Sequence, residues 1–121
     1  MPYYYDLREY IATLESQGKL RRIQAEINKN TELHPLVRWQ FRGLEEAERK
    51  AFLFEKVVDG RGRRYSTSVL VAGLAASKDI YALGMRCAHH EITQRWSEAQ
   101  LHPISPRLVA SGTAQEEIHG E

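Results

Sequence analysis

AFLFEKVV, at residues 51–58, combines aromatic, aliphatic and β-branched side chains in one short run. This composition is typical of a buried strand, because such side chains pack well on a pleated surface. Residues 59–62 read DGRG, which is the chemistry of a tight turn and predicts a hairpin or near-hairpin. Val69–Ala72 is a continuous apolar run, which predicts an inner strand.

An earlier strand is predicted at residues 22–27, where the hydrophobic period is two. The apolar residues there are Ile23, Ala25 and Ile27, and a polar residue precedes each of them. Strict alternation places all three on one side of a strand and leaves the other side solvated. This segment therefore predicts a strand with one wet face.

A first helix is predicted from about Leu7 to Gln17. Asp6 is a good N-cap, and Glu9 three residues later completes a capping box. Gly18 predicts the end of the helix, because glycine readily takes the left-handed conformation found there. The apolar face at helical spacing consists of Leu7, Tyr10, Ile11 and Leu14.

A second helix follows the polar turn at residues 28–30. We expect Thr31 to cap it, with Pro35 tolerated in the first turn, where early N–H groups have no helical acceptor. Gly43 breaks or bends it, and residues 44–50 read as a charged turn. Its apolar spacing runs through Leu33, Leu36, Val37 and either Phe41 or Gln40.

A third helix is predicted after Ser77, its N-cap, with Asp79 in the first turn and an interruption near Gly84. A further helical segment, from about residue 87 to 100, places Ala88, Ile92, Trp96 and Ala99 on one face, and Pro103 and Pro106 end it. The predicted fold class is α+β: a small mixed sheet packed by about three helices, with an extended proline-containing C-terminal tail. Residues after Ser111 lack a period and are expected to be mobile unless bound.

The composition restricts the class of protein. With 121 residues, 42% of them hydrophobic, the chain suits one folded domain. Its 17 basic and 16 acidic residues leave a net charge of +1, which provides no bulk attraction for nucleic acid or an anionic membrane. The single cysteine, Cys87, fits a reducing, cytoplasmic setting. Neither a signal peptide nor an apolar run of membrane-spanning length is seen.

His89-His90-Glu91 is the one cluster that suggests a metal. The zinc protease pattern needs a second histidine four residues after the first, and Gln94 stands there instead. We therefore interpret the cluster as a solvated helix face, with Glu91 and Arg95 forming an ion pair one turn apart. Cys87 lies near both histidines in sequence, but we interpret it as a small buried hydrophobe.

The remaining candidates have structural interpretations. Residues 73–77 (GLAAS) lack the glycines and lysine of a phosphate loop, so Ser77 is expected to be a plain cap. Glu45-Glu46 and Glu116-Glu117 are expected to be exposed, so neither pair is a candidate for acid–base catalysis. The large aromatic residues Trp39, Phe41 and Trp96 are expected in the core, or on a surface that a further domain covers.

Several segments in order resemble the N-terminal domain of the UbiD family of prenylated-flavin-dependent decarboxylases. The opening helix and turn, residues 6–20, are similar to that family's first helix. The strand at residues 51–57 and the strand and helix start at residues 69–84 resemble the next elements. Pro103-Ile104-Ser105-Pro106 and Ser111-Gly112 resemble the crossover that leads into the cofactor-binding domain.

This resemblance implies a part in the reversible, non-oxidative decarboxylation of aromatic or α,β-unsaturated carboxylic acids. The family cofactor is prenylated FMN, held with manganese and potassium. The family's catalytic, cofactor-binding and metal-binding residues lie beyond this domain, so none is assigned to this chain. We expect residues 1–101 to form the N-terminal domain and residues 102–121 to form the connector, which here ends at Gly120-Glu121.

Three functional hypotheses remain at this point. In the first, the chain is the N-terminal portion of a UbiD-like enzyme and is not catalytic alone. In the second, it is a structural or interaction subunit that docks on a larger catalytic chain or on itself. In the third, it is a stand-alone binding module. The sequence does not distinguish a natural subunit from a truncation, a proteolytic remnant or an expressed fragment. It also leaves the substrate and the oligomeric state open.

Overall fold

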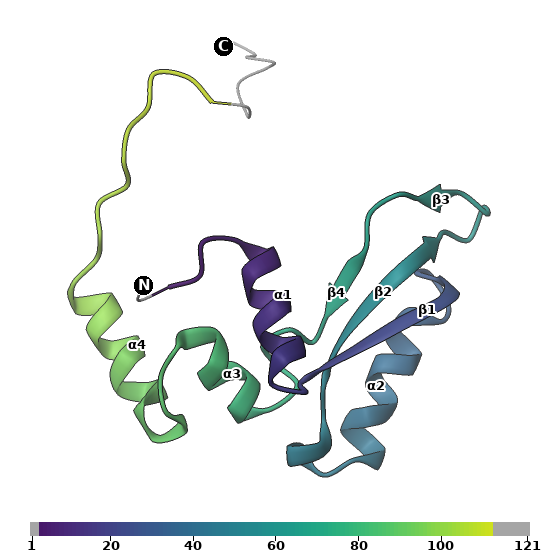
Figure 1. The fold of residues 1–121 in the computed structure, drawn as a ribbon, viewed down its shortest axis with the longest axis horizontal. Coiled ribbons are helices and arrows are strands. Elements are labelled where there is room, and N and C mark those ends of the chain that lie inside the picture. The colour runs from purple at the N-terminus through teal and green to yellow at the C-terminus, as the bar shows by residue number, and fades with distance from the viewer. Residues whose placement is uncertain (1–2, 113–121) are drawn as a thin grey trace.

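The computed structural model describes residues 3–112 and contains four α-helices and a four-stranded mixed sheet in that range (Figure 1). In chain order the elements are α1 (Leu7–Ser16), β1 (Leu20–Asn28), α2 (Leu33–Gly43), β2 (Ala51–Val58), β3 (Arg64–Tyr65), β4 (Val69–Val71), α3 (Lys78–Met85) and α4 (Ile92–Leu101). Short 3₁₀ turns occupy Glu46–Glu48 and His89–Glu91. The predicted α+β class is confirmed.

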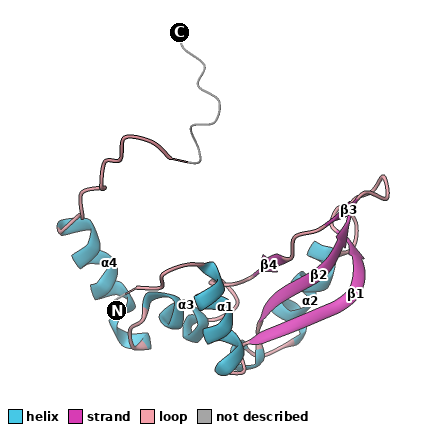
Figure 2. Ribbon diagram, turned by 45° about the horizontal axis from the view of Figure 1, so that its top comes forward, coloured by secondary structure: helices cyan, strands magenta, loops and turns pink. Residues whose placement is uncertain are grey.

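The stretch at residues 51–58 forms the centre of the sheet. Strand β2 pairs in parallel with β1, from Leu20 opposite Ala51 to Asn28 opposite Val58. Helix α2 makes the crossover that a parallel pair requires (Figure 2). On its other side β2 pairs antiparallel with both β3 and β4. The prediction of an inner strand at Val69–Ala72 is therefore wrong: β4 pairs only with β2 among the described strands and lies at an edge.

The predicted hairpin after β2 is confirmed by the antiparallel pairing of Val57 with Tyr65. Asp59 organises its turn, because its Oδ1 accepts hydrogen bonds of 2.9 Å from the backbone N–H groups of Arg61 and Arg63. These bonds stabilise the ionised carboxylate, and the bond from Arg63 contributes most to holding the pKa of Asp59 below its ordinary value. The turn therefore depends on Asp59 as well as on its glycines.

Strand β1 departs from strict alternation at its centre. Ile23 lies opposite Phe54 and Glu26 opposite Lys56, so Gln24 and Ala25 together face one residue of β2. Such a bulge shifts the following side chains by one position. Ile23 and Ile27 pack on the core, as predicted, but the prediction for Ala25 is wrong because the bulge leaves it exposed.

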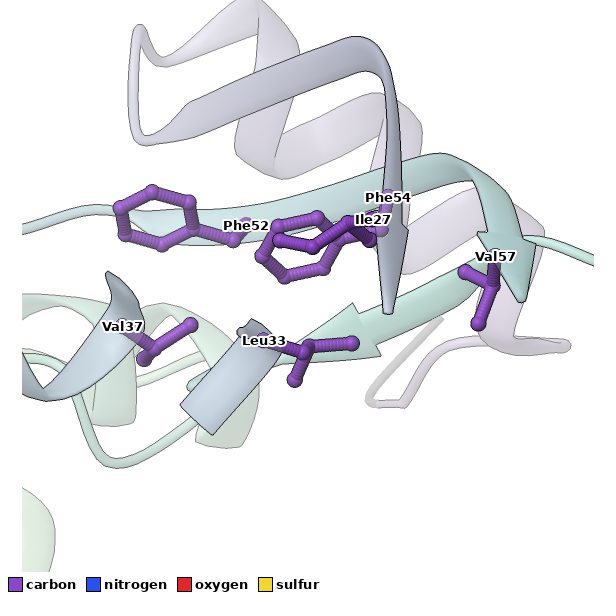
Figure 3. Packing of buried hydrophobic residues seen from close by; sticks show 6 residues of the cluster. All are labelled: Ile27, Leu33, Val37, Phe52, Phe54 and Val57. Carbon is purple, nitrogen blue, oxygen red and sulfur yellow. The ribbon is translucent and has the colours of Figure 1, made fainter. Parts of the chain in front are cut away.

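Side chains of β2 contribute to two hydrophobic clusters. Phe52, Phe54 and Val57 face α2 and pack with its Leu33 and Val37 (Figure 3). Ala51 belongs to a second cluster, which α1 and α3 build with Tyr10, Leu14 and Ile80. Because successive side chains of a strand point to opposite faces, Ala51 lies on the face opposite Phe52 and Phe54, so β2 joins the two clusters.

The ends of α1 are as the sequence predicts. Asp6 Oδ1 accepts a 2.9 Å hydrogen bond from Glu9 N–H, and Gly18 ends the helix with φ of 66°. The Glu9 side chain reaches one residue further than a capping box requires, because its Oε2 accepts from the backbone N–H of Tyr5 at 2.6 Å. Local sequence signals therefore determine this helix.

The start of α2 differs from the prediction. Thr31 does not cap it: Glu32 occupies the N-cap position and makes no side-chain capping bond. Instead, Glu32 Oε2 accepts a 2.8 Å bond from Asn28 N–H across the turn. Of the two residues considered for the apolar face, Gln40 rather than Phe41 is buried. Its Nε2 donates to the carbonyl oxygen of Lys50 and its Oε1 accepts from the Lys50 N–H, each at 2.9 Å. These bonds satisfy its buried amide group.

The predicted N-cap of α3 is confirmed, since Ser77 Oγ accepts a hydrogen bond of 3.2 Å from Ile80 N–H. The helix passes through Gly84 without interruption and ends because Arg86 takes a left-handed φ of 50°.

Helix α4 is shorter than predicted and contains no buried residue, so its expected apolar face is largely open. The described tail, residues 102–112, is extended and exposed and leads away from the sheet (Figure 1). The residues after Ser111, which were predicted to be mobile, lie outside the described part except for Gly112.

Candidate functional site

An apolar groove of about 590 Å³ lies where α1 approaches α3. Its lining comes from the N-terminal segment and α1, from the loop after β4, and from Gly84 of α3. Leu7 and Leu74 border the groove and are 58% and 48% exposed. The groove and its two bordering leucines form one contiguous apolar surface, a feature common at interaction sites.

Gly84 permits the close packing at the floor of this groove. A Cβ atom there would overlap Leu74 Cδ2 and would lie 3.2 Å from the Tyr10 hydroxyl oxygen. Glycine inside a helix is unfavourable for the backbone, so its presence in α3 has a packing reason. The groove thus depends on three segments that are distant in the sequence.

Tyr10 connects these segments through its hydroxyl group. The hydroxyl lies 2.5 Å from the carbonyl oxygen of Gly73 and 3.2 Å from that of Ile80, and it donates to them. Tyr4, whose ring centroid is 4.9 Å from that of Tyr10, donates to the carbonyl oxygen of Leu83 at 2.7 Å. Burial raises the pKa of Tyr10 to about 12, with the nearby Tyr4 as a smaller cause. Both phenols are therefore structural donors, which suits a packing surface.

The raised pKa of Tyr10 predicts a specific loss of stability in alkali. Its folded pKa of about 12 exceeds the ordinary value of 10.0. The stabilisation that Tyr10 contributes is therefore complete below pH 10.0 and disappears as the pH rises through the folded pKa. We expect the free energy of unfolding to fall by about 2 kcal/mol over this window because of Tyr10. Urea unfolding of wild type and Tyr10→Phe across the window measures the difference.

The matched control for this prediction is Tyr5→Phe, because Tyr5 is 85% exposed. That variant should keep the full alkaline decline of the wild type, whereas Tyr10→Phe should lose most of it. An equally steep decline in Tyr10→Phe would show that another group causes it.

Arg86 holds the N-terminal segment against the end of α3. Its Nη2 donates to Glu9 Oε1 at 2.9 Å, and its guanidinium carbon lies 4.2 Å from the centroid of the Tyr4 ring. The cation–π contact and the ion pair together offset the left-handed backbone of Arg86. This arrangement positions Tyr4 at the edge of the groove.

A second surface, the basic face of α2, consists of His34, Pro35, Arg38, Trp39 and Arg42, which line an open cavity of about 380 Å³. Trp39 is 71% exposed, so its predicted place in the core is wrong. Phe41 and Trp96 are also exposed, and for all three the remaining interpretation is a surface that another domain or chain covers.

The His89-His90-Glu91 cluster is a helix start. Glu91 Oε2 accepts a 2.7 Å hydrogen bond from Ala88 N–H, and His89 Nδ1 lies 3.6 Å from Asp79 Oδ1. The predicted ion pair between Glu91 and Arg95 is not among the salt bridges of residues 3–112. Within the same range, no three His, Cys, Asp or Glu side chains gather closely enough to hold a metal ion.

Cys87 is half-buried rather than buried, and its backbone has the clearer role. Its N–H donates to the carbonyl oxygen of Ala82 at 3.1 Å, while Arg86 N–H donates to that of Leu83 at 3.2 Å. This pair of bonds is the Schellman ending of α3. The cysteine therefore lies at a helix end.

The geometry defines a small α+β domain with an apolar groove between α1 and α3. A family model described as the 3-octaprenyl-4-hydroxybenzoate carboxy-lyase N-terminal domain matches residues 11–100. The chain belongs to this family, the N-terminal domain of the UbiD carboxy-lyases, and the predicted resemblance is confirmed. No solved structure matches the chain. None of the described helices has the length and apolar character needed to cross a membrane.

Proposed function

We propose that this chain is the N-terminal portion or subunit of a UbiD-like non-oxidative (de)carboxylase acting on aromatic or α,β-unsaturated carboxylic acids. The family match supports a carboxy-lyase context. In this proposal residues 1–101 form the domain, residues 102–121 form the connector, and the enzyme works in the cytoplasm. The single observation that carries the packing role is the groove between α1 and α3, with its exposed Leu7 and Leu74.

The partner in this proposal is the cofactor-binding remainder of the enzyme. Manganese is held by carboxylate and imidazole ligands, and residues 3–112 do not gather three such side chains. The proposal therefore leaves the metal to the remainder of the enzyme, and we assign no chemical step to the described residues. The domain contributes by covering apolar surface of the remainder and so shaping the cleft between the two.

Co-expression with a UbiD-like catalytic remainder that begins after Glu121 tests the proposal. We expect co-purification, prenylated-flavin absorbance in the complex, and loss of decarboxylation when this chain is omitted. Failure to associate, with this chain folded and monomeric, would favour the stand-alone module. Association without any effect on flavin content or activity would favour a structural subunit.

A pair of variants locates the contact. Leu74→Glu places a charge at the edge of the groove and should weaken co-purification by about tenfold or more, because burying an unpaired charge is costly. Leu44→Glu makes the same change at a residue 39% exposed at the end of α2, and should have little effect. Equal loss in both variants would place the contact elsewhere.

A further inference from the structure

A hollow of about 410 Å³ lies between α2 and the strand β1, and we call it the α2–β1 hollow. Among the described strands β1 pairs only with β2, so it forms the outer edge of the sheet (Figure 2). Leu36 and Trp39 of α2 and Leu44 after it border the hollow, and they are 41%, 71% and 39% exposed. Large apolar side chains that remain exposed around one concavity are a feature of interaction sites.

The rim of the hollow carries charges of both signs. Arg21 and Glu48 border it, and both side chains are exposed. Within residues 3–112, no ion pair or hydrogen bond engages either of these side chains. Lys50 adds a second cation to the rim. A partner that covers the hollow therefore has to present an apolar centre together with an acidic and a basic group, since charges across an interface are arranged to be complementary.

A second copy of this chain meets that requirement. In a two-fold contact the same patch faces itself, so each pair of contacting residues occurs twice. The apolar centre then covers the apolar centre, and Glu48 of each copy opposes Arg21 of the other. We infer that the α2–β1 hollow is the interface of a homodimer, in which Trp39 of each copy packs into the hollow of its partner.

Trp39 is the anchor of this interface. Its ring contributes little to the core of the described domain, because most of its surface is exposed. Tryptophan is among the side chains that most often dominate the binding energy of protein interfaces. The two-fold contact buries two such rings beside Leu36 and Leu44, and the charged rim surrounds them.

The dimer interface is separate from the groove between α1 and α3, because the residues that line the two surfaces do not overlap. The inference therefore does not rest on the proposed enzymatic context. Leu44→Glu should disrupt the dimer and leave co-purification with the catalytic remainder intact, whereas Leu74→Glu should have the opposite effects. The two surfaces can thus fail independently in experiment.

Charge reversal tests the pairing of Glu48 with Arg21. We expect sedimentation velocity to show a dimer of the wild type that weakens as salt rises. Glu48→Arg and Arg21→Glu should each weaken dimerisation by about tenfold or more, because like charges then face each other in both symmetric contacts. An equimolar mixture of the two variants should form a heterodimer, since one contact joins the two introduced residues and the other joins the two native ones.

A second test concerns Trp39. Trp39→Ala should weaken dimerisation by about tenfold or more and leave the urea unfolding midpoint of the monomer unchanged, because the ring is largely exposed. In a Trp96→Phe background Trp39 is the only tryptophan, so its emission should shift to shorter wavelength as the dimer forms and stay unshifted in Glu48→Arg. The matched control Arg61→Glu reverses another exposed arginine and should leave the dimer intact.

Three results would overturn the inference. They are a wild type that stays monomeric at all concentrations, a dimer that survives Trp39→Ala and Glu48→Arg, and the absence of a heterodimer in the mixture. If the chain alone is monomeric and Leu44→Glu abolishes association with the catalytic remainder, the hollow belongs to that contact, and the inference is likewise wrong.

Discussion

Phe54→Ala is expected to destabilise the domain by about 3–5 kcal/mol, because it removes an aromatic side chain from the centre of the core. Phe54 has 0% exposure, stacks on Phe52 with ring centroids 5.9 Å apart, and faces α2 from the middle of the central strand. Domains of this size have a total stability of about 5–15 kcal/mol, so the loss is a large fraction of it. Urea unfolding followed by circular dichroism measures the change.

The control for this variant is Phe41→Ala on α2. Phe41 is 38% exposed, and its ring centroid lies 5.3 Å from the guanidinium carbon of Arg49, so its removal should cost less than about 1 kcal/mol. Similar losses in both variants would contradict the position of Phe54 at the centre of the core.

Leu14→Ala is expected to cost about 2–5 kcal/mol, because the surrounding side chains fill only part of the resulting cavity. Leu14 has 0% exposure and joins α1 to the cluster that contains Ala51, Ala76 and Ile80. Since this cluster supports the floor of the groove, the variant should also weaken co-purification with the catalytic remainder. Thermal unfolding and the co-expression assay together measure both effects.

Leu7→Ala is the matched control in the same helix. Leu7 is 58% exposed, so its truncation should change the free energy of unfolding by no more than about 0.5 kcal/mol. Because Leu7 lines the groove, it should nevertheless weaken co-purification. A stability loss equal to that of Leu14→Ala would contradict the helix orientation.

The sequence predicted best the features that depend on neighbouring residues. Asp6, Gly18 and Ser77 occupy the capping positions expected of them, because each interacts with backbone groups a few residues away. The prediction for Thr31 failed where a longer side chain, Glu32, bonded across the turn to Asn28. The prediction for Ala25 failed because a bulge depends on how two strands align.

The candidate site was harder to predict, because its contacts join distant residues. Tyr4 bonds to Leu83 over a sequence separation of 79, and Tyr10 bonds to Gly73 over 63. The local signal was Gly84, a glycine within a helical pattern, which the sequence alone suggested as an interruption. The structure shows instead that its missing side chain admits Leu74 and Tyr10.

The sequence by itself determined the α+β class, the central strand at residues 51–58, the first and third helices and the membership of the UbiD family, since periodicity, capping and ordered motifs are local. Only the tertiary structure decided that β4 lies at an edge, that Gln40 is buried while Trp39 is exposed, and that α1 and α3 enclose a groove. The physical reason is that burial depends on which elements pack together. The same helix face is buried when another element packs against it and exposed when none does.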